Sequence, residues 1–126
     1  MTEKRYTLDD FDFSRVNQPR PGEPTILLRL VEGAGVALYR HRDDSGAELI
    51  PAAPHLFKYR GGYTWGYGGS GPRNLSHAIS AHLFQDSTLT DSALIERASV
   101  ILGLISQLRQ DKEHDIKVAD IEKLFA

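Results

Sequence analysis

The segment 65–72, with the sequence WGYGGSGP, constrains this chain more than any other, because four of the six positions from Gly66 to Gly71 are glycine. Glycine lacks a Cβ atom, so the backbone can take positive φ angles or approach a neighbour closely. Pro72 then suits the first turn of a helix, where its missing N–H would have no partner anyway. We therefore expect a sharp strand-to-helix turn with Ser70 or Gly71 as N-cap. The free N–H groups of such a turn favour an anion.

The part of the chain before this turn has the patterns of β-strands. Apolar runs and alternating polarity predict strands in five segments: 25–31, 36–42, 47–51, 56–60 and 63–67. The last two flank Gly61 and Gly62, a pair that favours a tight hairpin. Because these strands follow one another closely in sequence, we expect them to pair antiparallel.

Helical periodicity dominates the rest of the chain. Apolar residues recur at helix spacing in three segments: 72–85, 91–109 and 118–125. Thr90 or Asp91 is a suitable N-cap for the second helix, and Val100 and Leu104 widen its apolar stripe, which predicts a central helix. Strands followed by helices indicate an α+β fold. We expect a small antiparallel sheet of about three to five strands, with about two to three helices packed on one face.

The length of 126 residues fits one domain. We expect that domain to span residues 25–126, preceded by an arm or linker over residues 1–24. Three prolines near its end favour an extended chain: Pro19, Pro21 and Pro24. The aromatic residues Tyr6, Phe11 and Phe13 make this arm a candidate contact for a homo-oligomer.

Composition excludes several classes of function. The chain has no cysteine, which excludes a disulfide scaffold, a thiolate nucleophile and any Cys-ligated metal. A net charge of −2 makes a nucleic-acid partner less favoured. The sequence contains no apolar run of the roughly 18 residues that a membrane span needs. We expect a cytoplasmic protein with no membrane association.

Three catalytic or nucleotide motifs resemble the glycine segment only in part. Gly66, Gly68 and Gly71 match the dinucleotide pattern, but a helix follows where a second parallel strand is required. The lysine of a phosphate-binding P-loop is absent, since Arg73 follows Pro72. A nucleophile elbow at Ser70 would need glycine where Pro72 stands. Two interpretations remain open, a structural turn and a non-catalytic anion or ligand site.

Cations and aromatic residues accompany the glycine segment. Lys58, Arg60 and Arg73 are the charged residues between His55 and Phe84, a stretch without Asp or Glu. Strand alternation would put three aromatic rings on one face, either as core or as a stacking platform for bases. His77 stands one helical turn after Arg73 and is within reach of the same ligand. The candidate ligand-binding residues are Lys58, Arg60, Tyr63, Trp65, Tyr67, Gly68, Gly69, Ser70, Gly71, Arg73 and His77. We expect no catalytic residue, no metal ligand and no cofactor.

The stretch Tyr63–Leu75, with the sequence YTWGYGGSGPRNL, resembles a family of small uncharacterised proteins of bacteria, plasmids and phages. Their shared pattern is aromatic-W-G-Y-G-G-S-G-P-x-x-L followed by an apolar helix. The resemblance includes Tyr39-Arg40 and 115–125 and leaves out residues 1–24. The chain departs from it at Ser76 and His77, where the family has small aliphatic residues. The resemblance implies a mobile-element setting and no particular activity.

Three hypotheses for the function follow. The first is a non-catalytic binding protein of phage or mobile-element type that captures a phosphorylated or nucleotide ligand, with a role against host defence. The second is an inhibitor or adaptor of a host protein, in which the glycine segment is purely structural. The third is a nucleic-acid-binding accessory protein that uses Arg40 and Arg42 together with the cations named above.

Overall fold

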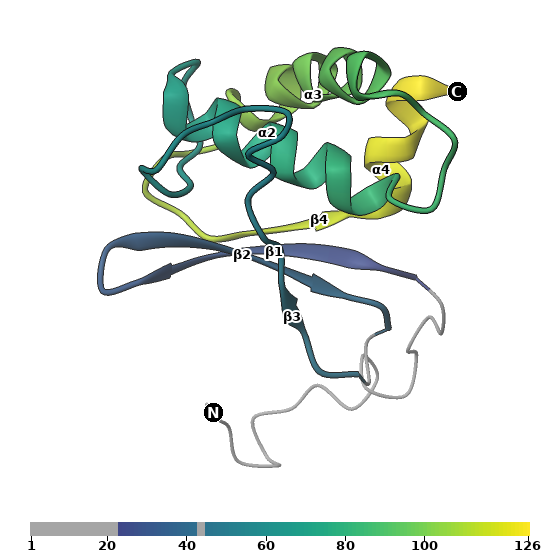
Figure 1. Ribbon diagram of the computed structural model, residues 1–126. Helices are drawn as coiled ribbons and strands as arrows, with labels where there is room; N and C mark the ends of the chain where they lie inside the picture. The colour runs from purple at the N-terminus through teal and green to yellow at the C-terminus, as the bar shows by residue number, and fades with distance from the viewer. Residues whose placement is uncertain (1–22, 43–44) are drawn as a thin grey trace.

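The computed structural model describes residues 23–42 and 45–126, and it has a sheet covered by helices on one face (Figure 1). The strands are β1 (Thr25–Val31), β2 (Ala34–Arg40), β3 (Glu48–Leu49) and β4 (His114–Lys117). The helices are α2 (Ser70–Leu83), α3 (Asp91–Ile105) and α4 (Val118–Glu122), followed by the 3-10 turn η2 (Lys123–Phe125). The strand order is β3-β2-β1-β4, and every pairing is antiparallel. The predicted α+β fold is therefore confirmed.

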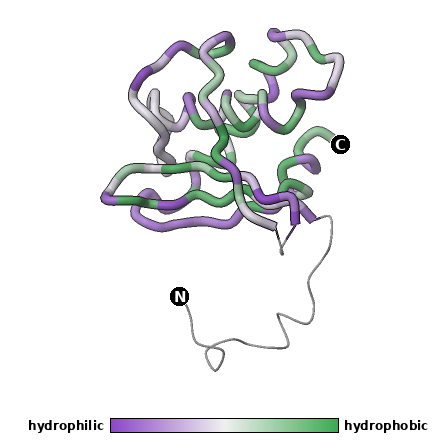
Figure 2. The backbone as a smooth tube through the Cα atoms, turned by 60° about the horizontal axis from the view of Figure 1, so that its bottom comes forward, coloured by the Kyte–Doolittle hydropathy of each residue, from purple (hydrophilic) through white to green (hydrophobic). Residues whose placement is uncertain are grey.

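Strand β1 lies in the middle of the sheet, and its alternation separates two faces. Ile26 and Leu28 are fully buried in the core, opposite Tyr39 and Ala37 of β2. Arg29 lies on the other face, where its guanidinium forms an ion pair of 2.7 Å with Asp115. In Figure 2, hydrophobic positions concentrate in the strands and helices, and hydrophilic positions mark several connecting loops.

Helix α2 is the central helix, although the sequence predicted that role for α3. Nine of the 14 residues of α2 are buried, against four of the 15 residues of α3. Helix α2 lies between the sheet and α3, so it is covered on both sides (Figure 1). Four of the buried residues of α2 are polar: Asn74, Ser76, His77 and Ser80. The Ser80 hydroxyl, for example, donates to the carbonyl of Leu94 at 2.7 Å and joins α2 to α3.

The expected hairpin around Gly61 and Gly62 is wrong. Residues 56–60 form no strand, since Leu56 and Phe57 donate their N–H groups back to the carbonyl of Ala53 and make a turn. Of residues 63–67, only Tyr63 joins the sheet, through an isolated bridge to Gly35.

Strand β4 was not among the strands predicted from the sequence. Its single buried apolar residue, Ile116, pairs with Ile26 of β1, and this contact is too local to appear as a pattern in sequence. The other boundaries are close to expectation. Gly69 is the N-cap of α2, and Thr90 is the N-cap of α3, where its hydroxyl accepts from the N–H of Ala93 at 3.2 Å.

The arm predicted over residues 1–24 lies outside the described residues up to position 22, and so does the proposed oligomer contact through it. Within 23–42 and 45–126, none of the helices has the length and apolar character needed to cross a bilayer.

Candidate functional site

Three of the four glycines in segment 65–72 have packing reasons inside the protein. Gly66 has a φ of +94°, its N–H donates to the carbonyl of Ile105 at 3.1 Å, and a Cβ atom there would meet the backbone of Gln110 at 2.9 Å. A Cβ atom on Gly71 would collide with the hydroxyl of Thr64, and one on Gly69 would meet the ring of Tyr67. Because these glycines have no side chain, the turn can pack closely against the segment after α3 and against the side chains of Thr64 and Tyr67.

No packing contact among the described residues requires glycine at position 68. A Cβ atom built on Gly68 meets no heavy atom within 4 Å, and its φ lies outside the left-handed region. The residue lines a pocket instead. The fold therefore tolerates a side chain at Gly68, and the position differs from its glycine neighbours.

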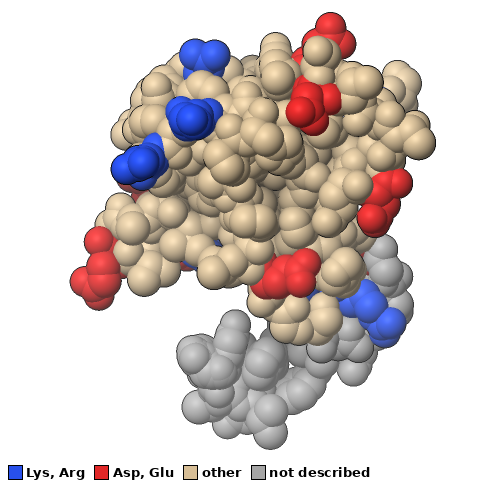
Figure 3. All heavy atoms as spheres, in the orientation of Figure 1, with Lys and Arg blue, Asp and Glu red and all other residues tan. Residues whose placement is uncertain are grey.

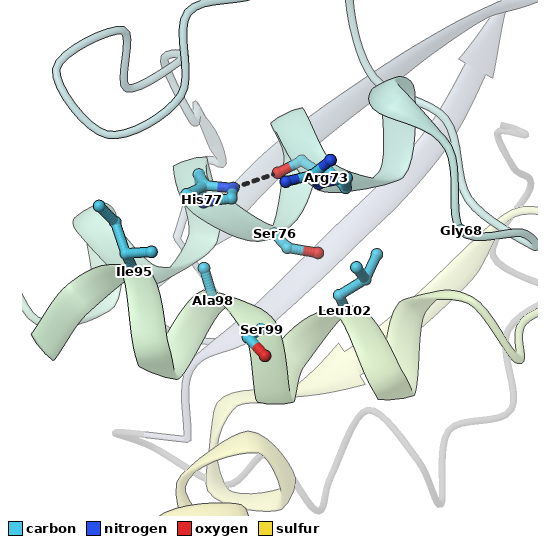
Figure 4. Close-up of a pocket in the computed structure, with 8 residues that line it drawn as sticks. All are labelled: Gly68, Arg73, Ser76, His77, Ile95, Ala98, Ser99 and Leu102. Atoms are coloured by element: carbon cyan, nitrogen blue, oxygen red, sulfur yellow. Dashed lines mark hydrogen bonds between the residues drawn. The ribbon is translucent and has the colours of Figure 1, made fainter. Parts of the chain in front are cut away.

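The pocket has a volume of about 390 Å³ and lies between the first half of α2 and the middle of α3 (Figure 4). Small-molecule sites commonly start at roughly 300 Å³. Its lining combines a cation, an imidazole, two hydroxyls and apolar side chains: Gly68, Arg73, Ser76, His77, Ile95, Ala98, Ser99 and Leu102. Of the eleven candidate residues from the sequence, Gly68, Arg73 and His77 lie together here.

Arg73 and His77 are held by each other and by a third residue. The Nδ1–H of His77 donates to the carbonyl of Arg73 at 2.6 Å, because a carbonyl can only accept (Figure 4). The ring of Phe57 stacks on His77 with centroids 4.9 Å apart, and the Arg73 guanidinium lies 5.1 Å from the Phe57 centroid. Phe57 was not among the candidate residues, because residues 56–60 were predicted as a strand and the turn back to Ala53 was not foreseen.

His77 presents its second nitrogen without a protein partner. The residue is 8% exposed, and among the described residues Nε2 has no hydrogen-bond partner. Since Nδ1 carries the proton, Nε2 of the neutral ring is an acceptor, and the charged ring donates there. A buried histidine with one satisfied and one open nitrogen on a pocket wall is suited to bind a polar ligand atom.

The start of α2 adds two free donors beside the pocket. Ser70 and Gly71 occupy the first helical positions, and no acceptor for their N–H groups occurs in the parts of the chain that the structure describes. Pro72 has no N–H, and Arg73 donates to the carbonyl of Gly69 at 3.1 Å. The first turn contains no acidic residue. The positive end of the helix dipole is therefore available to an anion.

The three aromatic candidates lie apart from the pocket lining. Trp65 is 1% exposed in the core, and its Nε1–H donates to the carbonyl of Lys112 at 2.9 Å. The Tyr63 hydroxyl donates to the carbonyl of Ile50 at 2.9 Å, and burial raises the pKa of Tyr63 to about 12. Tyr67 is exposed, and its hydroxyl pairs with that of Thr64 at 3.0 Å. The strand that was expected to align them does not form.

The two remaining cations, Lys58 and Arg60, are exposed and do not line the pocket. Figure 3 shows Lys and Arg side chains gathered at one end of the helical layer and Asp and Glu side chains toward the other end. The basic and acidic side chains are therefore unevenly distributed over this face of the protein, in keeping with the stretch between His55 and Phe84 that contains no Asp or Glu.

The side of the pocket formed by α3 was missed from the sequence. The sequence analysis placed Ile95 and Leu102 in the apolar stripe of residues 91–109 and did not select Ser99. Only the packing of α3 on α2 brings these three residues to the pocket that Arg73 lines. Ser76 was likewise not a candidate, and its hydroxyl donates to the carbonyl of Pro72 at 2.8 Å. No local signal distinguishes these residues from ordinary helix residues.

A second polar cluster lies at the other end of α2. Nε2 of His82 and Nε2 of His41 lie 3.6 Å and 3.9 Å from one carboxylate oxygen of Glu48, and both imidazoles touch the edge of Tyr39. Among residues 23–42 and 45–126, no group of three or more potential ligands has the arrangement of a metal site. Through Glu48 and Tyr39, the cluster links β3 and β2 to the end of α2.

Fold and pocket together define a small α+β protein with a mixed polar and apolar pocket at a glycine-rich strand-to-helix turn. The chain belongs to DUF6166, a family of unknown function, whose model matches residues 31–126. This agrees with the expected membership of an uncharacterised family. Comparisons with curated proteins and with solved structures gave no match.

Proposed function

We propose that this protein is a non-catalytic binding protein that captures a phosphorylated small molecule in the pocket between α2 and α3. The observation that carries the proposal is the convergence of Gly68, Arg73 and His77 on one pocket of about 390 Å³. Arg73 supplies a permanent positive charge, and the first N–H groups of α2 supply dipoles of the same sign. The phosphate group lies at this end of the pocket.

The other end of the pocket suits an apolar or aromatic group. Ile95, Ala98 and Leu102 of α3 form its apolar wall, and Ser99 adds a hydroxyl. Sites for small molecules usually combine such a wall with a few polar groups that fix orientation. A nucleotide has both parts, since its base is flat and apolar on its faces and its phosphate is anionic. A nucleotide signal used in host defence is the ligand that a mobile-element setting would favour.

The purely structural interpretation of the glycine segment explains Gly66, Gly69 and Gly71, but it leaves Gly68 unexplained. A ligand that approaches the backbone closely requires a residue without a side chain at that position. Gly68 therefore favours the ligand-binding hypothesis over the adaptor hypothesis. The exposed cations Lys58 and Arg60 remain available to a longer phosphorylated ligand.

A thermal and chemical unfolding panel tests the proposal. Inorganic phosphate and mono-, di- and cyclic nucleotides are added to the wild-type protein. A ligand at ~100 times its dissociation constant adds about 2.7 kcal/mol to the free energy of unfolding. We expect at least one nucleotide to stabilise the protein, and the lack of any shift across the panel in folded protein would contradict the proposal.

Three variants place the ligand. Arg73→Gln should abolish the stabilisation, whereas Arg60→Gln, which removes an exposed cation outside the pocket lining, should retain most of it. Gly68→Ala should keep the unliganded stability and weaken binding, because its methyl group enters the pocket. Equal loss in Arg60→Gln and Arg73→Gln would indicate diffuse charge attraction and would reject the pocket as the site.

A further inference from the structure

Two exposed tyrosines lie close to the start of α2. Tyr59 and Tyr67 are 39% and 43% exposed. The ring of Tyr67 lies against Gly69, the N-cap of α2, because a Cβ atom on Gly69 would be 2.6 Å from Cε2 of that ring. The Tyr67 hydroxyl lies 3.0 Å from that of Thr64, and the Thr64 hydroxyl fills the space that a side chain on Gly71 would need. An accessible aromatic ring is therefore fixed beside the N–H groups of the first turn.

The second tyrosine, Tyr59, is connected to the same helix start through Phe57. The ring centroids of Phe57 and Tyr59 are 6.1 Å apart, and the Arg73 guanidinium lies 5.1 Å from the Phe57 centroid. The carbonyl of Gly62 accepts a hydrogen bond of 2.9 Å from the side-chain amide of Asn74 in α2. The loop that carries Tyr59 is therefore held against the first turns of α2, beside the proposed phosphate position.

Exposed cations accompany these two rings. Lys58 and Arg60 flank Tyr59 in the sequence, Arg73 lies in the first turn of α2, and all three cations are exposed. Within residues 23–42 and 45–126, none of the three forms an ion pair with a carboxylate. In Figure 3, Lys and Arg side chains gather at one end of the helical layer. The net charge of −2 is therefore not spread evenly, and a local surface can attract an anion.

The acidic residues of the segment after α3 have partners of their own. This segment lies beside the glycine turn, since the backbone of Gln110 packs against Gly66. Asp111 accepts two hydrogen bonds of 3.0 and 3.1 Å from Arg109, and Glu113 accepts one of 3.0 Å from a backbone N–H of β1. Neither carboxylate is therefore unpaired beside the basic surface.

We propose that the phosphorylated ligand of this site is part of a short single-stranded nucleic acid. One nucleotide places its phosphate against the first N–H groups of α2 and Arg73, and neighbouring bases stack on Tyr59 and Tyr67. Lys58 and Arg60 bind the phosphates that follow along the strand. The inference rests on the proposed function, because it uses the same phosphate position and extends the ligand over the adjacent surface.

Exposed aromatic rings among cations suit a single strand better than a mononucleotide or a duplex. Proteins that bind single strands combine a basic surface with rings on which successive bases stack, because every base has an aromatic face. A mononucleotide whose base lies in the pocket has no further base for Tyr59 and Tyr67. The bases of a duplex are already stacked on one another and offer their faces only at its ends.

Fluorescence anisotropy with the full chain and labelled single-stranded octamers of DNA and of RNA tests the inference. At least one octamer should bind ~10-fold or more tightly than its mononucleotide, because each stacked base contributes a separate contact. With about three phosphates neutralised, the logarithm of the association constant should fall with the logarithm of the salt concentration with a slope of about −2.

The two proposals fail in different ways. Octamers that bind no more tightly than mononucleotides would overturn the inference and leave the proposed function intact. A DNA duplex that binds as tightly as the single strand would show attraction by charge alone and would also overturn it. If no octamer binds, and neither phosphate nor any mononucleotide stabilises the protein, the proposed function fails together with the inference.

Variants of the two tyrosines test the stacking. Tyr59→Ala and Tyr67→Ala should each weaken octamer binding about 5-fold or more, the loss expected for one stacked base. Tyr67→Phe keeps the ring and removes the hydroxyl that pairs with Thr64, so it should bind the octamer as the wild type does. Unchanged affinity in both alanine variants would refute the assigned surface. Circular dichroism checks that each variant keeps the fold.

Variants of two exposed cations separate a defined path from general charge attraction. Arg60→Gln should weaken binding of the octamer and leave binding of the mononucleotide nearly unchanged. Lys117→Gln makes the same change of charge on strand β4, at a side chain that is 49% exposed, and is the matched control. It should bind the octamer as the wild type does. Equal losses in the two variants would contradict the inference.

Discussion

Substitution of Gly66 by alanine gives the sharpest test of how the glycine turn is built. Alanine at φ +94° is strained, at roughly 1–2 kcal/mol for an L-residue in the left-handed region. Its Cβ atom would also lie 2.8 Å from the Cβ atom of Gln110 and 2.9 Å from its backbone, so the turn must move away from the end of α3. Such overpacking costs about 1–3 kcal/mol. We expect Gly66→Ala to lose about 2–5 kcal/mol of unfolding free energy.

Gly68→Ala is the control two residues away, because its Cβ atom meets no neighbour. Alanine restricts the unfolded chain and should leave the stability equal or raise it by about 0.4–1 kcal/mol. Urea unfolding is followed by the fluorescence of Trp65, the single tryptophan, which is buried next to the turn. Equal stability of the Gly66 and Gly68 variants would refute the assignment of one glycine to packing and the other to the pocket.

Two further predictions concern stability. Ser80→Ala removes the buried hydrogen bond from α2 to the carbonyl of Leu94, which lies inside helix α3, and should cost about 0.5–1.5 kcal/mol in urea unfolding; an unchanged midpoint would contradict it. Burial raises the pKa of Tyr63 from 10.0 to about 12, so its contribution to stability is complete below pH 10 and is lost as the pH rises toward about 12. Unfolding midpoints should therefore fall less steeply over this interval in Tyr63→Phe than in the wild type.

The fold class followed from residues whose neighbours in sequence are also their neighbours in space. The runs that became β1 and β2 are joined by a short turn, and their pairing needs no distant contact. Thr90 was recognisable as an N-cap because a cap acts on the three residues that follow it. The start of α2 was placed within a residue or two by Gly69, Ser70 and Pro72 for the same reason.

The missed elements depend on partners that are distant in sequence. Strand β4 pairs with β1 some 90 positions earlier, and only Ile116 carries an apolar signal. Gly61 and Gly62 are suited to the hairpin that was expected over residues 56–67. In the structure, however, Tyr63 pairs with Gly35, and Leu56 and Phe57 donate to the carbonyl of Ala53. Local patterns do not decide between such competing partners.

The candidate site divides in the same way. Gly68, Arg73 and His77 were selected because they lie within one strand-to-helix turn and one helical turn of each other, and the structure brings these three to one pocket. Trp65 and Tyr63 were selected from a strand face that does not form, and the structure puts Trp65 in the core and bonds Tyr63 to Ile50. The pocket wall from α3 had no local signature.

By itself the sequence determined the strands β1 and β2, the approximate starts of α2 and α3, and the glycine turn that precedes α2, because these features rest on backbone freedom and short-range hydrogen bonds. Tertiary structure alone decided which helix is buried and which glycine is unnecessary for packing. Burial depends on what lies on the other side of a residue. The aliphatic α3 therefore remains half exposed, and the polar α2 lies between the sheet and α3.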